Sequence, residues 1–351
     1  MKTILVTGGL GFIGSNFIQL LLTDFSNYRI INLDAVTYAG NPKNLTEIET
    51  DSRYLFVHGD IGNQELIDGL LKREKPDFIV NFAAESHVDR SITGPAAFIE
   101  TNIVGTFTIL EAFRAYCSTG HKCRFLQVST DEVYGSLGAE GYFKETTPYS
   151  PNSPYAASKA SADHLVRAYH HTYKLDTLIT NCSNNYGPYQ FPEKLIPLMI
   201  SNALEGRDLP VYGDGKNIRD WLYVEDHCRA LELVMSTAKT NETYNIGGHN
   251  EMENIELVRL LCRSLDRRLG PLPDGRARET LITFVGDRQG HDQRYAIDAE
   301  KIKNDLGWEP QTDLAKGMEM TIDWYLDNQE WLNQVRDGSY RKYYQEMYDK
   351  R

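Results

Sequence analysis

Residues 3–14 of the sequence read Thr-Ile-Leu-Val-Thr-Gly-Gly-Leu-Gly-Phe-Ile-Gly. The apolar run Thr3–Thr7 is typical of a buried strand, and the glycines Gly8, Gly11 and Gly14 follow it. The next apolar residues recur at the spacing of one helix face: Ile13, Phe17, Leu20 and Leu21. A glycine-rich turn between a strand and a helix lets backbone N–H groups approach a pyrophosphate at the positive helix N-terminus. The stretch therefore predicts a dinucleotide site rather than an ordinary tight turn.

An acidic residue at the end of the next predicted strand favours NAD as the dinucleotide. Asp34 lies 20 residues after Gly14. A carboxylate at this place can bind the adenosine ribose hydroxyls and repels a 2′-phosphate, so NAD is preferred to NADP. The alternative is an aspartate that only stabilises a turn or a helix start. Asp60 also ends a predicted strand and, on its own, would be an ordinary loop acid.

Short apolar runs alternate with helical patterns along the first half of the chain. The predicted strands are Thr3–Thr7, Arg29–Leu33, Tyr54–Val57, Phe78–Ala83, Arg124–Ser129 and Thr177–Cys182. They are rich in Ile, Val, Leu and Phe, as parallel strands buried on both faces are. A helical pattern after Pro95 has its apolar residues on one face, at Ile99, Ile103, Leu110 and Phe113. We predict an α/β fold, a Rossmann-type doubly wound parallel sheet with right-handed crossovers.

The pattern changes after about residue 186, where Gly and Pro become more frequent. Short strand candidates lie between helices there: Leu209–Tyr212, Thr243–Ile246 and Leu281–Val285. This change predicts a smaller C-terminal substrate-binding lobe. We expect residues 1–187 to form the NAD-binding domain, with a returning segment near 223–248. Residues 188–222 and 249–351 would mainly form the substrate-binding lobe.

The composition disfavours several classes of protein. The 351 residues include 49 Asp and Glu against 37 Lys and Arg, a formal net charge of −12, which argues against nucleic-acid binding. The five cysteines include no Cys-x-x-Cys pair and the nine histidines no His-Glu-x-x-His pattern, so neither a disulfide framework nor a metal site is expected. With no signal peptide and no apolar run of about 18 residues, we expect a cytoplasmic protein that binds no membrane.

Tyr155 and Lys159 are candidates for acid–base chemistry because one helix would carry both. Ser153 and Pro154 are typical of a helix start, with the serine as N-cap. Residues four apart then share a helix face. A cationic lysine beside a phenol lowers the pKa of the phenol from about 10, which makes a usable base near neutral pH.

Two adjacent acids, Asp131 and Glu132, end the fifth predicted strand. Ligands of open parallel sheets bind beyond the carboxyl ends of the strands. Two acids there can divide the roles of acid and base if their surroundings separate their pKa values. In a continuing strand they would face opposite ways, so both reach one substrate only if the chain turns, which Gly135 permits. A solvated Asp-Glu pair is the common alternative.

Taken together, these motifs resemble those of the extended short-chain dehydrogenases/reductases, and among them the dehydratases of nucleotide sugars. The resemblance covers nearly the whole chain. Its stretches are the glycine triad with Phe12-Ile13, Asp34, Ala83–Ser91, Thr130–Glu132, Tyr155 with Lys159, Asn184–Pro188, Pro192–Leu195, Arg219–Trp221, Tyr244–Gly248 and Asp287–Asp292. Gln289 stands where the family pattern has proline.

The resemblance implies an NAD-dependent dehydration of dTDP-glucose to the 4-keto-6-deoxy sugar, as in deoxysugar biosynthesis. Tyr155 would take the proton from the hydroxyl on carbon 4 while NAD accepts hydride from that carbon. Glu132 would then remove the proton on carbon 5, and Asp131 would protonate the departing hydroxyl of carbon 6. Hydride would return to carbon 6, so the cofactor is regenerated in each cycle. Thr130 would bond the oxygen on carbon 4, and Lys159 would assist Tyr155.

The resemblance also implies two sets of binding residues. NAD would be bound by Gly8, Gly11, Phe12, Ile13, Gly14, Asp34, Asp60, Ile61, Ala83, Ala84, Ser86, Tyr155, Lys159 and Asn184. The nucleotide sugar would be bound by Ser86, Thr130, Asn185, Glu193, Lys194, Leu195, Tyr212, Arg219, Asn254, Arg288 and His291. The cations among them suit a diphosphate on an acidic protein. A homodimer is implied as well, with the helices after Pro95 and Pro154 packing against those of the partner.

Three other functions remain open at this point. A nucleotide-sugar 4-epimerase needs the tyrosine–lysine pair and NAD, but no acid pair to eliminate water. Other nucleotide-sugar dehydratases and decarboxylases would keep a glutamate at 132 without an aspartate at 131. A non-catalytic NAD-binding sensor is the alternative from a different class, because one fold hosts many functions.

Overall fold

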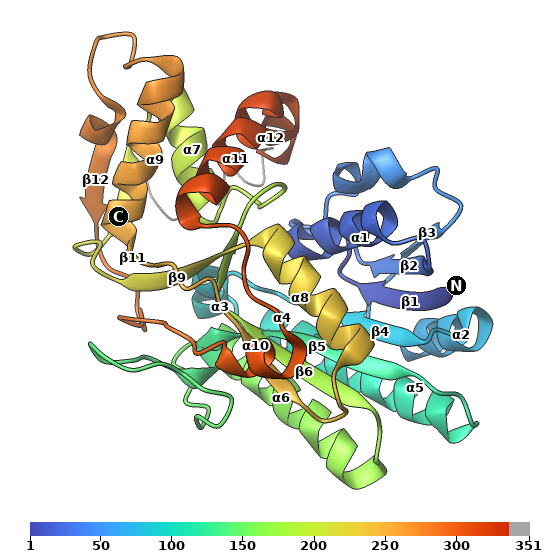
Figure 1. Cartoon of the computed structure of the whole chain (residues 1–351). Helices are drawn as coiled ribbons and strands as arrows, with labels where there is room; N and C mark the ends of the chain where they lie inside the picture. Colours follow the sequence, from blue (N-terminus) through green and yellow to red (C-terminus); the bar gives the residue numbers. More distant parts are fainter. Residues whose placement is uncertain (337–351) are drawn as a thin grey trace.

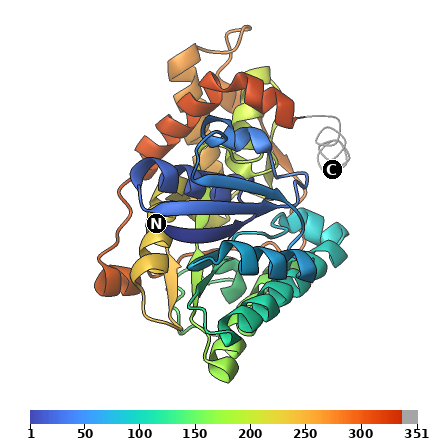
Figure 2. The same ribbon diagram turned by 90° about the vertical axis from the view of Figure 1, so that its right-hand side faces the viewer.

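The structure, a computed structural model, describes residues 1–336. Seven parallel strands form one sheet in the order β10-β6-β5-β4-β1-β2-β3, which confirms the predicted fold class (Figures 1 and 2). The strands are β1 Lys2–Thr7, β2 Tyr28–Asp34, β3 Tyr54–His58, β4 Phe78–Asn81, β5 Arg124–Thr130, β6 Thr177–Cys182 and β10 Thr243–Ile246. β4 ends at Asn81 rather than at Ala83 as predicted, because the chain leaves the sheet there to line a cavity.

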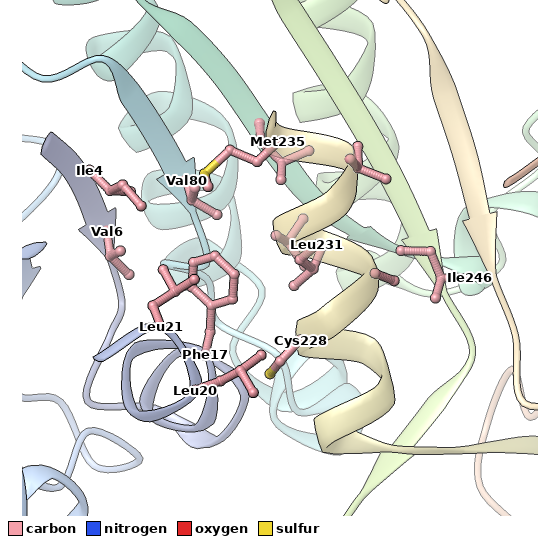
Figure 3. Close-up of a cluster of buried hydrophobic side chains, with 14 of the residues drawn as sticks. Ile4, Val6, Phe17, Leu20, Leu21, Val80, Cys228, Leu231, Met235 and Ile246 are labelled. Atoms are coloured by element: carbon pink, nitrogen blue, oxygen red, sulfur yellow. The ribbon is translucent and has the colours of Figure 1, made fainter. Parts of the chain in front are cut away.

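Helices cover both faces of the sheet, each through an apolar stripe. Figure 3 shows α1 (Phe12–Asp24) beside α8 (Val224–Thr237), with Phe17 of α1 and Leu231 of α8 directed into a shared core. The other face is covered by α2 (Gln64–Glu74), α5 (Thr106–Ser118) and α6 (Pro154–Tyr173). Each buried Leu or Phe contributes roughly 1.5–3 kcal/mol to folding, so these two cores hold the sheet rigid beneath the site.

A third core lies outside the main sheet, between helices at the upper left of Figure 1. Those helices are α7 Leu195–Glu205, α9 Asn254–Leu269, α11 Leu314–Asp327 and α12 Gln329–Val335. Two small sheets accompany them, β11-β9-β7 and β12-β8. Their strands are β7 Asn184–Tyr186, β8 Leu209–Tyr212, β9 Ile218–Tyr223, β11 Glu251–Glu253 and β12 Ile282–Val285. Residues 337–351 of the expected substrate-binding lobe lie outside the described residues.

The remaining helical segments are short. They are α3 Val88–Thr93, α4 Ala96–Phe98 and α10 Glu300–Leu306, the 3-10 helices Pro42–Ile48, Asp131–Tyr134 and Arg278–Leu281, and the π-helix Ile99–Gly105. The strand candidate Thr243–Ile246 is β10 of the main sheet, placed beside β6. The chain thus returns to the large sheet after passing through the smaller lobe.

The helix predicted after Pro95 differs in one respect from the expected single apolar face. Leu110 and Phe113 are fully buried, but Ile99 is 44% exposed. The reason is the π-helix Ile99–Gly105, whose wider turn breaks the 3.6-residue period between Ile99 and the buried residues that follow.

The continuous helical stretch Ala96–Ser118 is long and apolar enough to cross a membrane by length and composition alone, which the sequence prediction did not recognise. Half of its apolar 18-residue segment is buried inside the fold, as in the core helix of a globular domain. It packs against α2 and α6.

Candidate active site

The glycine turn brings the start of α1 against the ends of β1 and β4. Gly8 has φ +70°, and a Cβ there would stand 2.6 Å from the backbone nitrogen of Ala83. A Cβ on Gly14 would stand 2.4 Å from the carbonyl oxygen of Gly8. Both glycines are therefore required by close backbone contacts, and the amino end of α1 faces the cavity beside them.

This close contact predicts the effect of Gly14→Ala. The added methyl group has no room against the Gly8 carbonyl, so α1 must move and the turn must distort. We expect a loss of roughly 1–3 kcal/mol of stability together with weaker NAD binding. Gly69→Ala in α2 is the matched control, because nothing lies within 4 Å of its Cβ position. Thermal unfolding and NAD titration should show the control at or slightly above wild-type stability; equal behaviour of both variants would contradict the prediction.

One cavity at the carboxyl edge of the sheet is lined by every residue predicted to bind NAD. These residues are Gly8, Gly11, Phe12, Ile13, Gly14, Asp34, Asp60, Ile61, Ala83, Ala84, Ser86, Tyr155, Lys159 and Asn184. The cavity lies where the strand order reverses between β1 and β4, the place at which open α/β sheets bind ligands. The residues present fit a dinucleotide: a glycine turn at a helix start, and an acid at the end of β2.

Asp34 is held in a fixed orientation by the backbone around it. One carboxylate oxygen accepts the N–H of Leu10 at 2.9 Å, and the other accepts the N–H of Val36 at 2.8 Å. Burial raises the pKa of Asp34, and the two backbone N–H groups oppose that rise. Val36 has φ +53°, which is rare for a β-branched residue, so the loop after β2 is strained where it passes the cavity.

The turn expected after Thr130 is present as the 3-10 helix Asp131–Tyr134, whose N-cap is Thr130. The hydroxyl of Thr130 accepts the N–H of Glu132 at 3.3 Å. Gly135 follows with φ +89°. Thr130 and Glu132 line the cavity. Asp131 is only 2% exposed, and its Oδ2 finds no hydrogen-bond partner among the described residues.

The two acids differ in their electrostatic surroundings. Burial, and then the charge of Glu132, raises the pKa of Asp131 well above its ordinary value. Burial also raises the pKa of Glu132, but the cations Arg288, Lys194 and Arg219 oppose that rise. The cations around Glu132 thus distinguish the two acids, in the direction that a base beside an acid requires.

Tyr155 and Lys159 both line the cavity from α6, whose N-cap is Ser153 with Pro154 in the first turn, as predicted. The expected lowering of the Tyr155 pKa is not found in this structure. Burial, and then the carboxylate of Glu132, raises that pKa well above its ordinary value. The ammonium of Lys159 donates to the carbonyl oxygen of Val128 at 2.8 Å. Burial lowers the pKa of Lys159, and Asp163 one turn along α6 opposes this.

The residues predicted to bind the substrate fall into two groups. The first group lines the same cavity: Ser86, Thr130, Asn185, Glu193 and Lys194. The ammonium of Lys194 donates to the carbonyl oxygen of Ser86 at 2.7 Å. Leu195, which was predicted with them, begins α7 and packs against the core of the smaller lobe.

The second group does not line this cavity; its members are Tyr212, Arg219, Asn254, Arg288 and His291. Tyr212 donates to Asp89 Oδ2 at 3.0 Å, and its ring meets that of His291 edge to face. Arg288 Nε lies 3.9 Å from Asp89 Oδ1. Arg219 is buried, and its guanidinium lies over the ring of Tyr295. Asn254 begins α9, and its buried Oδ1 has no hydrogen-bond partner among the described residues. The charges of Arg219 and Arg288 act on Glu132, which ties this group to the cavity.

Sequence reasoning missed several residues that line the cavity. They are Thr37, Ala39, Gly40, Glu85, Thr101, Gln190 and Phe191, among others. The first three follow Asp34 in the same loop, and Gln190 and Phe191 precede the predicted Glu193 and Lys194. For these five residues, proximity in the sequence to a predicted site residue was the available signal. No group of three or more metal-ligating side chains occurs within residues 1–336.

Comparison with known proteins identifies the family. Residues 5–321 match the family model described as GDP-mannose 4,6 dehydratase. The chain belongs to the GDP-mannose 4,6-dehydratase family. The resemblance to the extended short-chain dehydrogenases/reductases is thereby confirmed.

The chain is also similar to several proteins named dTDP-glucose 4,6-dehydratase. A dTDP-glucose 4,6-dehydratase from Xanthomonas campestris is 57% identical over 346 residues, 97% of this chain and 98% of that protein. The dTDP-glucose 4,6-dehydratase of Streptomyces venezuelae, solved with NAD and TYD bound, is 47% identical with a TM-score of 0.89, covering 95% of this chain and 100% of that one. That of Bacillus anthracis, solved with NAD, is 49% identical with a TM-score of 0.86 at the same coverage.

Proposed function

We propose that this chain converts dTDP-glucose to dTDP-4-keto-6-deoxyglucose as a hydro-lyase, with NAD as its resident cofactor. The observation that carries the proposal is the meeting of two sets of groups in one cavity. Glu132 and Tyr155 line the same cavity as the glycine turn and Asp34, and Asp131 lies directly beside Glu132. High identity to enzymes named for this reaction supports the choice of substrate.

The first stage is oxidation at carbon 4 of the sugar. When bound, NAD accepts a hydride from carbon 4 and later returns it to carbon 6, and its positive charge favours a neighbouring phenolate. Tyr155 takes the proton of the carbon 4 hydroxyl, and Thr130 bonds the same oxygen. Lys159, whose ammonium donates to the Val128 carbonyl, would supply a positive charge from the same face of α6 as Tyr155.

The second stage removes water across carbons 5 and 6. The ketone at carbon 4 acidifies the hydrogen on carbon 5. Glu132 accepts that proton, and it returns a proton to carbon 5 when hydride is delivered to carbon 6. Asp131, whose pKa is raised by burial and by the charge of Glu132, supplies a proton to the departing hydroxyl of carbon 6. Proton transfers of this kind contribute about 10²–10⁴-fold each to the rate.

The nucleotide end of the substrate needs cations, because the protein as a whole is acidic. Lys194, Arg219 and Arg288 are the cations whose charges reach Glu132 in this structure. A diphosphate placed among them would be bound by charge-assisted hydrogen bonds, which are stronger than neutral ones. The diphosphate would then lie among these three cations, on the side of Glu132 that faces the smaller lobe.

A homodimer and a cytoplasmic location complete the proposal. Ile99, Val104 and Phe107 are 44%, 41% and 45% exposed on one helical stretch, and they would be covered by the same stretch of a partner. All five cysteines are free, which suits a reducing compartment. Light scattering at micromolar concentration should give twice the chain mass, and Phe107→Asp should shift the mass toward that of one chain. A wild-type protein of single-chain mass would refute the dimer.

The decisive test is turnover of dTDP-glucose by the purified protein without added NAD, followed by mass spectrometry. The expected product has lost one water. UDP-glucose, supplied in parallel, tests selectivity for the base. If the mass were unchanged and chromatography separated dTDP-galactose from the substrate, the protein would instead be a 4-epimerase. Bound NAD without any turnover of either substrate would favour the non-catalytic alternative.

A further inference from the structure

We propose that Tyr38, Arg90 and Glu193 form a clamp that keeps NAD in the protein from one turnover to the next. The proposal rests on the proposed function, since it concerns the cofactor of that reaction. It departs from the substrate-binding role that family resemblance implies for Glu193. We call these three residues the Tyr38 clamp.

The clamp is a closed set of polar and ring contacts. The carboxylate of Glu193 accepts the hydroxyl of Tyr38 at 3.1 Å through Oε1, and Nε of Arg90 at 3.0 Å through Oε2. The guanidinium of Arg90 lies 3.9 Å from the centre of the Tyr38 ring. The side chain of Glu193 is only 2% exposed. Each member thus contacts both others, so none can move without breaking two contacts.

The clamp joins three separate segments around the cavity. Tyr38 lies in the loop after β2, Arg90 in α3, and Glu193 just before α7. Thr37 and Ala39, on either side of Tyr38, line the cavity from one loop, and Phe191 and Lys194 line it from the other. The rings of Tyr38 and Phe191 also meet edge to face, 5.7 Å apart. The two loops are therefore tied together where both border the proposed NAD site.

Burial makes the clamp cooperative. If the Tyr38 loop moved away alone, the Glu193 carboxylate would lose the tyrosine hydroxyl while Arg90 still held it inside the protein, and if the Glu193 loop moved alone, both contacts would break. An unpaired buried charge is costly, so the two loops should open together or not at all. NAD is oxidised again at the end of each cycle and need not leave. Slow opening would also prevent loss of the reduced cofactor between the two hydride transfers.

The contacts of Glu193 argue against a direct role in substrate binding. Both of its carboxylate oxygens are used by the clamp, and the side chain is covered by protein. Its neighbour Lys194 instead reaches the carbonyl of Ser86 and carries the positive charge near Glu132. Glu193 is thus a positioning residue, and Lys194 is the member of this pair that suits a diphosphate.

The test uses Glu193→Gln and Tyr38→Phe in the full-length chain. Gln keeps the shape but places an amide against Arg90, and Phe keeps the ring under Arg90 but removes the hydroxyl. The matched control is Glu111→Gln on α5, in a similar cluster away from the cavity. Glu111 accepts the hydroxyl of Tyr169 at 2.5 Å and Arg114 at 2.7 Å, and Arg114 lies 5.1 Å from the Tyr173 ring.

Two quantities are measured besides activity: NAD per chain after gel filtration without cofactor, and the rate of exchange with isotopically labelled NAD. Wild type and Glu111→Gln should retain their NAD. Glu193→Gln should lose most of it and exchange roughly ten- to hundredfold faster, as expected for a lost hydrogen bond to a charged group. Tyr38→Phe should change in the same direction by a smaller factor. With saturating NAD, both variants should unfold at the wild-type temperature.

Contrary outcomes are distinct from one another. Unchanged NAD content and exchange in Glu193→Gln, with a raised KM for the nucleotide sugar, would overturn the clamp and restore a substrate role. Wild-type protein that neither carries nor binds NAD would refute the proposed function instead. If Glu193→Gln does not fold, Tyr38→Phe decides alone, because wild-type exchange in that variant also overturns the clamp.

Discussion

Glu132→Gln is expected to lower the turnover of dTDP-glucose by about 10²–10⁴-fold while nucleotide-sugar and NAD binding stay near wild-type values. Gln keeps the size of the side chain and removes the proton acceptor. Glu132 lines the cavity, so the change acts where the substrate is proposed to lie. The measurement is steady-state turnover, together with exchange of the carbon 5 hydrogen for solvent deuterium. That exchange should disappear in the variant.

The variant Asp131→Asn distinguishes the role of Asp131 from that of Glu132. Burial and the charge of Glu132 raise the pKa of Asp131, so its proposed task is donation and not removal of a proton. Asp131→Asn should still exchange the carbon 5 hydrogen but should release water slowly. If deuterium exchange at carbon 5 were lost in Asp131→Asn and kept in Glu132→Gln, Asp131 would be the base and Glu132 the acid. Wild-type turnover in Glu132→Gln would remove Glu132 from the mechanism.

The pH dependence follows from the same surroundings. Glu132 must be ionised to act, and its pKa is raised above that of an exposed glutamate. Activity should therefore decline, as the pH falls, at a higher pH than an ordinary glutamate would give. Removing one opposing cation, as in Arg288→Met, should raise the Glu132 pKa further and move this decline to still higher pH.

Tyr155→Phe is the second large expected loss, again about 10²–10⁴-fold in turnover, because the variant cannot accept the proton from the carbon 4 hydroxyl. The phenol faces the cavity, and its ring packs edge to face on Phe98, 6.3 Å away. That packing survives the substitution, so the fold and NAD content should be unchanged. Turnover and deuterium exchange at carbon 5 should both fail, since no ketone forms to acidify that position.

Lys159→Met distinguishes an electrostatic role from a purely structural one. Without a cation behind it, the Tyr155 phenolate is less stable, so the rise of activity with pH should move to higher pH. Lower turnover with an unshifted profile would mean that Lys159 only orients its neighbours through the Val128 carbonyl. Turnover by Tyr155→Phe at the wild-type rate would remove this residue from the oxidation step.

The fold class was predictable because its signals are local. Parallel strands buried on both faces appear as continuous apolar runs, and β1, β2 and β6 begin or end within a residue of the predicted bounds. The start of α6 followed from Ser153 and Pro154 alone. The residues predicted to bind NAD meet in one cavity because most of them follow the carboxyl end of a parallel strand or begin α1, and Tyr155 and Lys159 lie in the first two turns of α6.

What could not be predicted depends on contacts between distant segments. Tyr38 and Glu193 are 155 positions apart, and no spacing rule connects them. The pKa of Tyr155 is raised by burial, which the pattern of a tyrosine four residues before a lysine does not contain. The exposed Ile99 results from a π-turn, and apolar periodicity assumes an unbroken α-helix.

The return of the chain to the main sheet has a consequence for protein synthesis. A nascent chain that ends at residue 187 already contains six of the seven strands, but β10 is missing from the edge of β6. The face of the main sheet that α1 covers also lacks α8, whose Leu231 and Met235 complete the core between this face and the two helices (Figure 3). An unpaired strand edge and an uncovered apolar face are both prone to association. The amino-terminal half should therefore need chaperone protection on the ribosome until residue 246 has emerged.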